Sequence, residues 1–189
     1  LEGERRENPI TVEVVISIVR NWADQEKFHS VSFTGGEPLL QSDFLLALAS
    51  EVRSLGILTY LDTSGTLSDR LAKVIEVINI VALDFKLPST PGVTIEEADV
   101  RRCLEIAKGK AFVKMVLTAN ALIPEIDRAS QIISEVDRNT VVVLQIATPV
   151  NPTVTPPDGE FLAKARATVE RYGLSVHILP QLHVLVGWK

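Results

Sequence analysis

Residues 31–41 read VSFTGGEPLLQ, an apolar strand that runs into a Gly-Gly turn and then into a helix. Two adjacent glycines at the end of a strand let the backbone turn tightly and let a ligand approach main-chain groups. Glu37 adds a carboxylate beside this turn, and Pro38 fixes the backbone at its exit. An isolated Gly-Gly pair is typical of an ordinary βα loop. The full tetrapeptide between a strand and a helix favours a binding site for a polar, amino-bearing ligand.

Strands and helices alternate along the chain on either side of this turn. Apolar runs such as INIVALDF and VVVLQIA indicate strands that are buried on both faces, as in a parallel sheet. The predicted strands span residues 31–33, 57–61, 78–85, 111–117, 140–146 and 174–179. The predicted helices begin after Thr11, with Trp22 on the apolar face, and at Ser42, and they also span residues 67–77, 96–108, 124–136 and 160–172.

Polar residues gather at the carboxyl ends of these strands. A barrel draws its site from the ends of several strands, whereas a doubly wound open sheet concentrates it at one switch point. We therefore predict an α/β fold, a partial parallel TIM-like (β/α) barrel of about six strands, in which residues 1–189 form a single domain. The polar strand ends are residues 34–37, 62–64, 84–86, Gln145 and Thr148.

Composition narrows the class of protein. The 189 residues carry 19 basic and 24 acidic side chains, a net charge of -5, which argues against a general nucleic-acid binder. No apolar run approaches the ~20 residues of a membrane span. The single cysteine, Cys103, excludes a disulfide framework and suits a reducing compartment. We expect a cytoplasmic protein that binds neither nucleic acid nor membrane.

Charged side chains in the predicted strands allow two interpretations. Asp84 and Lys86 flank Phe85, and the period of two places both on one face, where a charged pair is costly unless it is paired or at the rim. The pair is therefore either a structural ion pair or part of a ligand site. Lys114, in the middle of AFVKMVL, is predicted to be a snorkelling or ion-paired lysine.

Three of these segments together resemble the radical S-adenosylmethionine enzymes. TGGEPLL resembles their GGEP motif, which holds the amino group of the methionine moiety. DTSG at residues 62–65 resembles the DTCG or DTNG loop that lies along the methionine and ribose, and DFK at residues 84–86 resembles the DxK of glycyl-radical activating enzymes. The resemblance implies an S-adenosylmethionine site made of Gly35, Gly36, Glu37, Pro38, Thr63, Ser64, Asp84, Phe85, Lys86, Gln145 and Thr148.

Two segments resemble the 7-carboxy-7-deazaguanine synthases in particular. In these enzymes a Gln-Pro segment contacts S-adenosylmethionine at the place of Gln145, where this chain has Ile146 instead of proline. PQLHVLVG resembles the Gln-x-His-Lys segment that closes these enzymes, with Val184 at the place of the basic residue. The resemblance implies that the tail, residues 180–189, lies near the active site. The implied substrate-binding residues are Thr34, Gln181 and His183.

The resemblance also implies metals. In glycyl-radical activating enzymes the two matching aspartates help to bind a monovalent cation, which implies a monovalent ion or Mg2+ near Asp62 and Asp84. Radical S-adenosylmethionine enzymes hold a 4Fe-4S cluster with three cysteines of a C-x3-C-x2-C loop. This chain has only Cys103, on the apolar face of a predicted helix, which indicates core packing. We expect the first strand and the cluster loop to lie upstream of Leu1, so that this chain alone is inactive.

The function implied is that of a radical S-adenosylmethionine lyase or oxidoreductase in its full-length form. The resemblance favours a 7-carboxy-7-deazaguanine synthase, which contracts the ring of a carboxy-tetrahydropterin with Mg2+ on the route to queuosine or archaeosine. It implies an electron donor such as flavodoxin or ferredoxin, and a homodimer. A glycyl-radical activating enzyme, favoured by DTSG and DFK, is the alternative. A non-catalytic β/α domain that binds a small molecule or a protein is the alternative of another class.

Overall fold

The computed structural model describes residues 9–90, 96–149 and 154–181. These residues form one sheet of six parallel strands whose spatial order follows the sequence. A doubly wound sheet would reverse its strand order at a switch point, and this sheet does not, so the predicted partial barrel is confirmed. The strands are β1 (Ser30–Phe33), β2 (Leu58–Thr63), β3 (Ile80–Asp84), β4 (Ala111–Leu117), β5 (Val141–Ile146) and β6 (Val176–Pro180).

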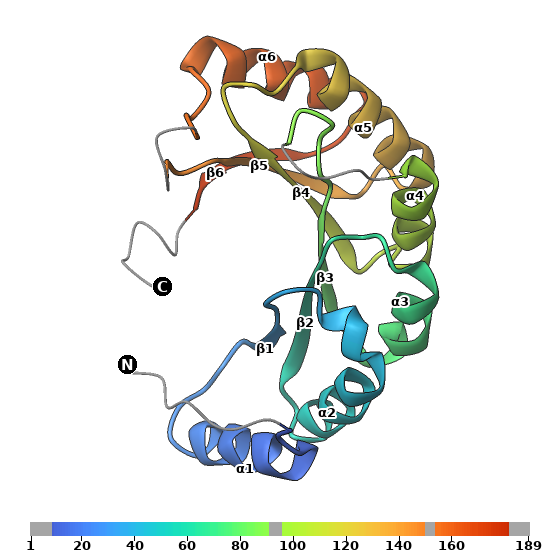
Figure 1. The fold of residues 1–189 in the computed structure, drawn as a ribbon, viewed down its shortest axis with the longest axis vertical. Coiled ribbons are helices and arrows are strands. Elements are labelled where there is room, and N and C mark those ends of the chain that lie inside the picture. The colour runs from blue at the N-terminus through green and yellow to red at the C-terminus, as the bar shows by residue number, and fades with distance from the viewer. Residues whose placement is uncertain (1–8, 91–95, 150–153, 182–189) are drawn as a thin grey trace.

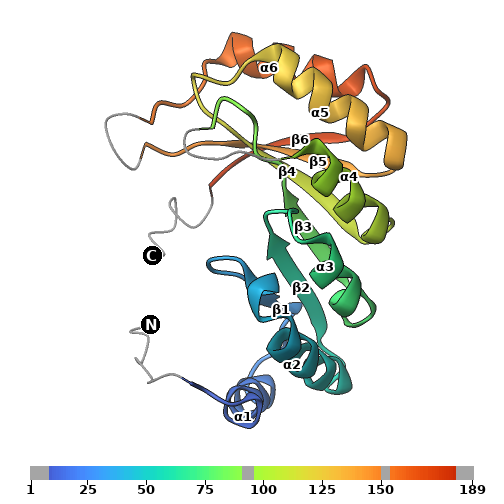
Figure 2. The same cartoon turned by 45° about the vertical axis from the view of Figure 1, so that its right-hand side comes forward.

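The helices cover the outer side of the curved sheet and leave its concave side open (Figures 1 and 2). Within the described residues, β1 pairs only with β2 and β6 only with β5, so the barrel is not closed. No described helix is long and apolar enough to cross a membrane. The helices are α1 (Val12–Ala23), η1 (Pro38–Gln41), α2 (Ser42–Ser54), α3 (Ser68–Val74), η2 (Ile75–Val77), α4 (Glu97–Ile106), α5 (Ile123–Val136) and α6 (Gly159–Glu170), of which η1 and η2 are short 3-10 helices.

Alternation along each strand separates the core from the concave face. Leu61 in β2, Leu83 in β3 and Met115 in β4 are fully buried beneath the helices. Their neighbours Asp62 and Lys114 point to the other face and are only partly buried. The hydrophobic core thus lies between sheet and helices, and the concave face carries the polar residues.

The first helix confirms one prediction and corrects another. Thr11 is the N-cap of α1, and its hydroxyl accepts a hydrogen bond from the Val14 amide at 3.4 Å. Trp22, predicted on the apolar inward face, is instead 56% exposed. The buried residues of α1 are Ile16 and Val19, so the face that packs against the core is centred one turn earlier than the tryptophan suggests.

Gly65 is required by packing as well as by backbone conformation. Its φ is +71°, and a Cβ built on it would lie 2.9 Å from Cγ of Leu83. We expect Gly65→Ala to lower the free energy of unfolding by about 2 kcal/mol, from the left-handed backbone and the overlap together. Urea denaturation measures this loss. Gly109→Ala is the matched control, because Gly109 has φ +76° with no atom within 4 Å of a Cβ. Equal losses would contradict the role of the Leu83 contact.

Candidate functional site

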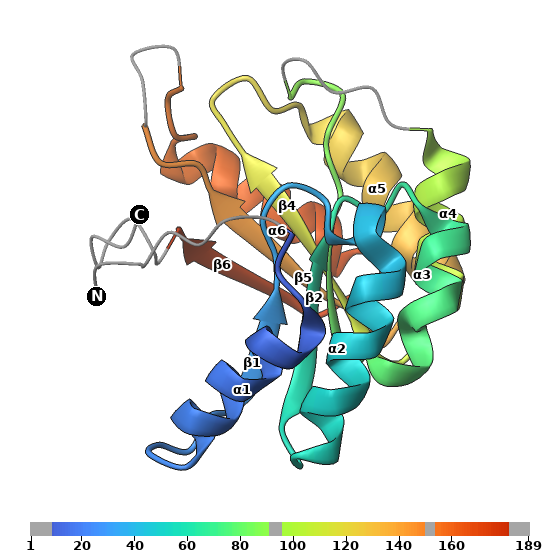
Figure 3. The ribbon, with the colours of Figure 1, turned by 60° about the horizontal axis from the view of Figure 1, so that its bottom comes forward.

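The carboxyl ends of the parallel strands meet at one edge of the sheet (Figure 3). The loop after β1 carries Thr34, Gly35 and Gly36, and the loop after β2 begins at Ser64. Asp84 ends β3, so its side chain and that of Lys86 lie at the same edge. The structure therefore brings the segments TGGE, DTSG and DFK, which are far apart in sequence, to one rim.

The two glycines of the first loop present open backbone. Gly35 and Gly36 have φ values of +88° and +56°, and a Cβ built on either would meet no atom within 4 Å. Neither takes part in the backbone hydrogen bonds that join the described loops and turns, and both are exposed. Their main-chain groups are therefore open to a ligand.

Glu37 joins the loops that follow β1 and β2. One carboxylate oxygen, Oε1, accepts hydrogen bonds from the Leu39 amide at 3.1 Å and the Thr63 hydroxyl at 2.9 Å. The other, Oε2, accepts them from the Ser64 amide at 2.8 Å and the Ser64 hydroxyl at 2.7 Å. Four donors of the chain thus surround the carboxylate, which we assign to holding the rim together. The sequence suggested the carboxylate as a ligand contact because its partners, 26 and 27 residues away, are brought to it only by the fold.

The side chains of β2 alternate between the two faces of the sheet, so DTSG contributes residues to both faces. Thr63 is 2% exposed and points to the helix side, where it meets Glu37. Asp62, one residue earlier, points to the concave face and meets Lys114. DTSG is thus both a structural turn, as its composition predicts, and the source of a carboxylate on the concave face.

Four charged side chains form a compact cluster on the concave face. The Lys114 Nζ lies 3.3 and 3.4 Å from the two carboxylate oxygens of Asp62 and 4.0 Å from Oδ2 of Asp84. Lys86 is paired with the same Oδ2 of Asp84. The other oxygen of Asp84, Oδ1, is buried and has no hydrogen-bond donor among the described residues. We call Asp62, Asp84, Lys86 and Lys114 the concave charge cluster, and its formal charges cancel.

An aromatic pair lies beside this cluster. The rings of Tyr60 and Phe112 have centroids 6.2 Å apart, although β3 separates their strands. Burial raises the pKa of Tyr60, and the charge of Asp62 raises it further. Ala82 in β3 stands in register with both Asp62 and Phe112, and its small side chain leaves room for contacts across it. Sequence reasoning missed this pair. The feature that could have indicated it is an alanine on the middle strand between long side chains of the two neighbouring strands.

The remaining predicted residues are distributed along the same edge. Phe85 is 6% exposed and its ring belongs to the core, so only its backbone can face a ligand. Gln145 lies on the concave face in register with Val116. The side-chain oxygen of Gln181 accepts a hydrogen bond from the Thr148 amide at 2.9 Å, which ties the start of the tail to the loop after β5. His183 and the rest of the tail lie outside the described residues.

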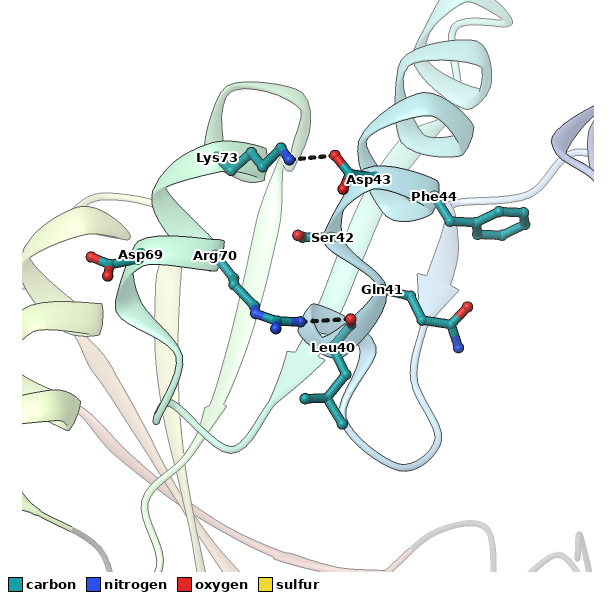
Figure 4. A pocket seen from close by; sticks show the side chains of 8 residues that line it. All are labelled: Leu40, Gln41, Ser42, Asp43, Phe44, Asp69, Arg70 and Lys73. Carbon is teal, nitrogen blue, oxygen red and sulfur yellow. Dashed lines mark hydrogen bonds and ion pairs between the residues drawn. The ribbon is translucent and has the colours of Figure 1, made fainter.

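A groove of about 570 Å³ lies on the outer surface, between α3 and the point where η1 runs directly into α2 (Figure 4). Arg70 of α3 crosses it and donates to the carbonyl oxygens of Leu39 at 3.2 Å and Leu40 at 2.6 Å. Lys73 pairs with Asp43 at its other end. These contacts hold the turn that follows Glu37, and none of the predicted site residues lines the groove. A smaller hollow, about 180 Å³, opens directly at Thr34, Gly35, Glu37 and Pro38.

The chain does not supply ligands for an iron–sulfur cluster. Its one cysteine, Cys103, lies in α4 and is fully buried in the core. Burial raises the pKa of its thiol to about 12, and the charge of Asp99 adds to the shift. Across the described residues, no three His, Cys, Asp or Glu side chains gather as a metal site.

Cys103 should therefore be inert in the folded protein. Iodoacetamide reacts with thiolates, so we expect native protein to be alkylated at least about a hundredfold more slowly than protein unfolded in urea. Mass spectrometry of timed samples measures both rates. Rapid labelling of native protein would mean that the thiol is exposed and ionised.

Comparison with known proteins identifies the relatives of this chain. The family described as a 4Fe-4S single cluster domain matches residues 3–87, a segment without cysteine. The chain is 36% identical over 187 residues to a 7-carboxy-7-deazaguanine synthase of Geobacter sulfurreducens, covering 96% of this chain and 73% of that protein. It is 30% identical over 184 residues to the synthase of Methanopyrus kandleri, covering 95% and 69%.

Solved structures agree on the fold. A domain of pyruvate-formate lyase-activating enzyme from Bacteroides vulgatus superimposes with a TM-score of 0.68 at 21% identity, covering 80% of this chain and 99% of that one. A radical SAM methyltransferase from Sphaerobacter thermophilus gives a TM-score of 0.62 at 15% identity, covering 90% and 58%. The sequence relatives, which are synthases, place the chain among enzymes. The chain belongs to the 7-carboxy-7-deazaguanine synthase family of radical S-adenosylmethionine enzymes.

Proposed function

We propose that this chain is the core domain of a 7-carboxy-7-deazaguanine synthase that binds S-adenosylmethionine along the rim and a carboxy-tetrahydropterin on the concave face. The observation that carries the proposal is the open backbone of Gly35 and Gly36. A Cβ built on either glycine would meet no atom within 4 Å. A ligand amino group can be held there by main-chain carbonyls. Glu37 fixes the loop by accepting hydrogen bonds from Thr63 and Ser64.

The charges of the rim support the same ligand. Lys86 is partly exposed at the end of β3, where an ammonium can pair with the carboxylate of the methionine moiety. The backbones of Thr63 and Phe85, the hydroxyl of Ser64, and Gln145 and Thr148 complete the site that we infer. Thr34, which is exposed, and Gln181, which is tied to the loop after β5, are the residues that we assign to the substrate. His183 and the remaining tail, residues 180–189, join them in this proposal.

S-adenosylmethionine supplies radical chemistry when a reduced cluster cleaves it, and the thiolates for that cluster are not in this chain. In this proposal the described residues bind and orient the two organic ligands. A Mg2+ or monovalent ion at Asp62 and Asp84, which the sequence suggests, would have to compete with the Lys114 ammonium for the same carboxylates. We further infer a cytoplasmic homodimer that receives its electron from flavodoxin or ferredoxin.

A glycyl-radical activating enzyme is the second candidate. The segments DTSG and DFK favour it, because both resemble that class. Its substrate would be a large protein, which needs a docking surface rather than an enclosed site. The two candidates therefore differ in the size of the molecule from which hydrogen is abstracted.

The complete gene product decides between them. We expect its reading frame to encode a C-x3-C-x2-C motif within a few tens of residues before Leu1. After anaerobic reconstitution with iron and sulfide, it should form 5′-deoxyadenosine and 7-carboxy-7-deazaguanine from S-adenosylmethionine and the carboxy-tetrahydropterin. A frame without these cysteines would refute the proposal. Formation of 5′-deoxyadenosine only with a glycyl-radical protein would establish the second candidate.

A further inference from the structure

Lys114 reaches across a whole strand to find its partner. In the sheet its neighbour on β3 is Asp84, whereas Asp62 on β2 is in register with Ala82. Adjacent strands lie about 4.8 Å apart, so the backbones of β2 and β4 are about 10 Å apart. The Lys114 side chain can span this distance because the small side chain of Ala82 leaves open space over β3, between β2 and β4.

The Lys114 ammonium is held as a point charge rather than by one directed bond. Its distances to the two oxygens of Asp62, 3.3 and 3.4 Å, are nearly equal, and Oδ2 of Asp84 lies 4.0 Å away on the other side. The Lys114 side chain is 19% exposed, and those of Asp62 and Asp84 are 31% and 14% exposed. Three carboxylate oxygens from two strands thus lie around one compact positive charge, and carboxylate oxygens are the type of ligand that hard cations prefer.

We propose that the Lys114 ammonium is a built-in cation, which fills the position between Asp62 and Asp84 and keeps free metal ions out of it. The two carboxylates need a positive charge, because two partly buried anions on adjacent strands repel each other. A lysine on β4 supplies that charge permanently and at any ionic composition. A separate ion would have to displace this ammonium from the two oxygens of Asp62 and from Oδ2 of Asp84.

The arrangement also assigns different tasks to the two lysines. Asp84 is shared, since Lys86 pairs with it directly and Lys114 lies 4.0 Å from it. Lys86 is 29% exposed and stands at the rim, so it is the lysine that can turn toward a ligand carboxylate. Lys114 then remains to compensate Asp84. This division of tasks rests on the proposed function, whereas the built-in cation does not.

The test is the replacement of the built-in cation by a free one. We expect Lys114→Met to lower the unfolding midpoint by roughly 5 °C in tetramethylammonium chloride, because Asp62 loses its partner and Asp84 keeps only Lys86. Potassium, sodium or magnesium chloride at the same ionic strength should restore at least half of that loss in the variant. The midpoint of the wild-type protein should be the same in all four salts. Differential scanning calorimetry on this chain measures these shifts, and no S-adenosylmethionine is needed.

Two control variants make the result specific. Lys73→Met removes a lysine that pairs with Asp43 on the outer surface, and its midpoint should not depend on the identity of the cation. The double change Lys114→Met with Asp62→Asn should lose the recovery. A folded Lys114→Met protein without ion-specific recovery would overturn the proposal. Should Lys114→Met not fold, sodium-23 relaxation of the wild-type protein decides, since sodium binding that Asp62→Asn abolishes would also overturn it.

Discussion

Replacing Glu37 by alanine should cost the protein about 3–5 kcal/mol of unfolding free energy, an unusually large effect for a residue outside the core. The carboxylate accepts four hydrogen bonds, from the Leu39 amide, the Thr63 hydroxyl, and the amide and hydroxyl of Ser64. Thr63 is buried, so its hydroxyl would be left without its partner in a place that water reaches poorly. Urea denaturation followed by circular dichroism measures the loss.

Two variants define what the carboxylate does. Glu37→Gln keeps an acceptor for Leu39 and Thr63 but turns an amide group toward the Ser64 N–H, so about half of the loss is expected. Glu125→Ala is the control, because that carboxylate accepts one hydrogen bond, from the Leu122 amide at 3.4 Å. Its loss should stay below about 1 kcal/mol. A Glu37→Ala protein as stable as the control would show that the loops hold without the carboxylate.

The same variant separates two ways of losing ligand affinity. If Glu37 acts by positioning, Glu37→Ala should weaken S-adenosylmethionine binding through a disordered loop, and Glu37→Gln should recover affinity in step with stability. If the carboxylate contacts the ligand directly, affinity should fall in Glu37→Gln beyond what the stability loss explains. Isothermal titration calorimetry of the complete gene product measures the affinities. The four internal donors lead us to expect the first outcome.

Local patterns predicted the parts of the fold that depend on neighbouring residues. Alternating strands and helices, buried apolar strands and polar strand ends sufficed for a partial barrel with its site at one rim. The Thr11 cap and the strand Ala111–Leu117 were predicted at the positions where the structure has them. The exposure of Trp22 was not predicted. The turn of an amphipathic helix that packs against the core depends on how the helix lies against its neighbour, here α2.

The parts that sequence reasoning missed depend on pairs brought together by the sheet. Glu37 was predicted to contact a ligand. Its hydrogen-bond partners in the loop after β2 were missed, because they depend on how β1 and β2 pair. Lys114 was predicted to be ion-paired, but its partner Asp62 lies two strands away and 52 residues earlier. Such contacts carry no periodic signal. They require the strand order, which no single segment determines.

Ala82 is the residue that permits these contacts, and Ala82→Leu should destabilise the protein by about 3 kcal/mol. The side chain of Ala82 is 1% exposed although it points to the open concave face, because longer neighbours cover it. A leucine would fill the space through which Lys114 reaches Asp62 and across which Tyr60 and Phe112 approach to 6.2 Å. Overpacking costs about 1–3 kcal/mol, and the broken ion pair adds to it.

The predicted cause can be told from a general intolerance of larger side chains. Ala72→Leu is the matched control, since Ala72 is exposed on α3 and should change stability by less than about 0.5 kcal/mol. Ala82→Leu should also weaken the near-ultraviolet circular dichroism of Tyr60, whose ring loses its fixed neighbour. Combined with Lys114→Met, it should cost less than the sum of the two changes, because both break the same contact with Asp62. Strict additivity would mean that Ala82 does not act by keeping the path to Asp62 clear.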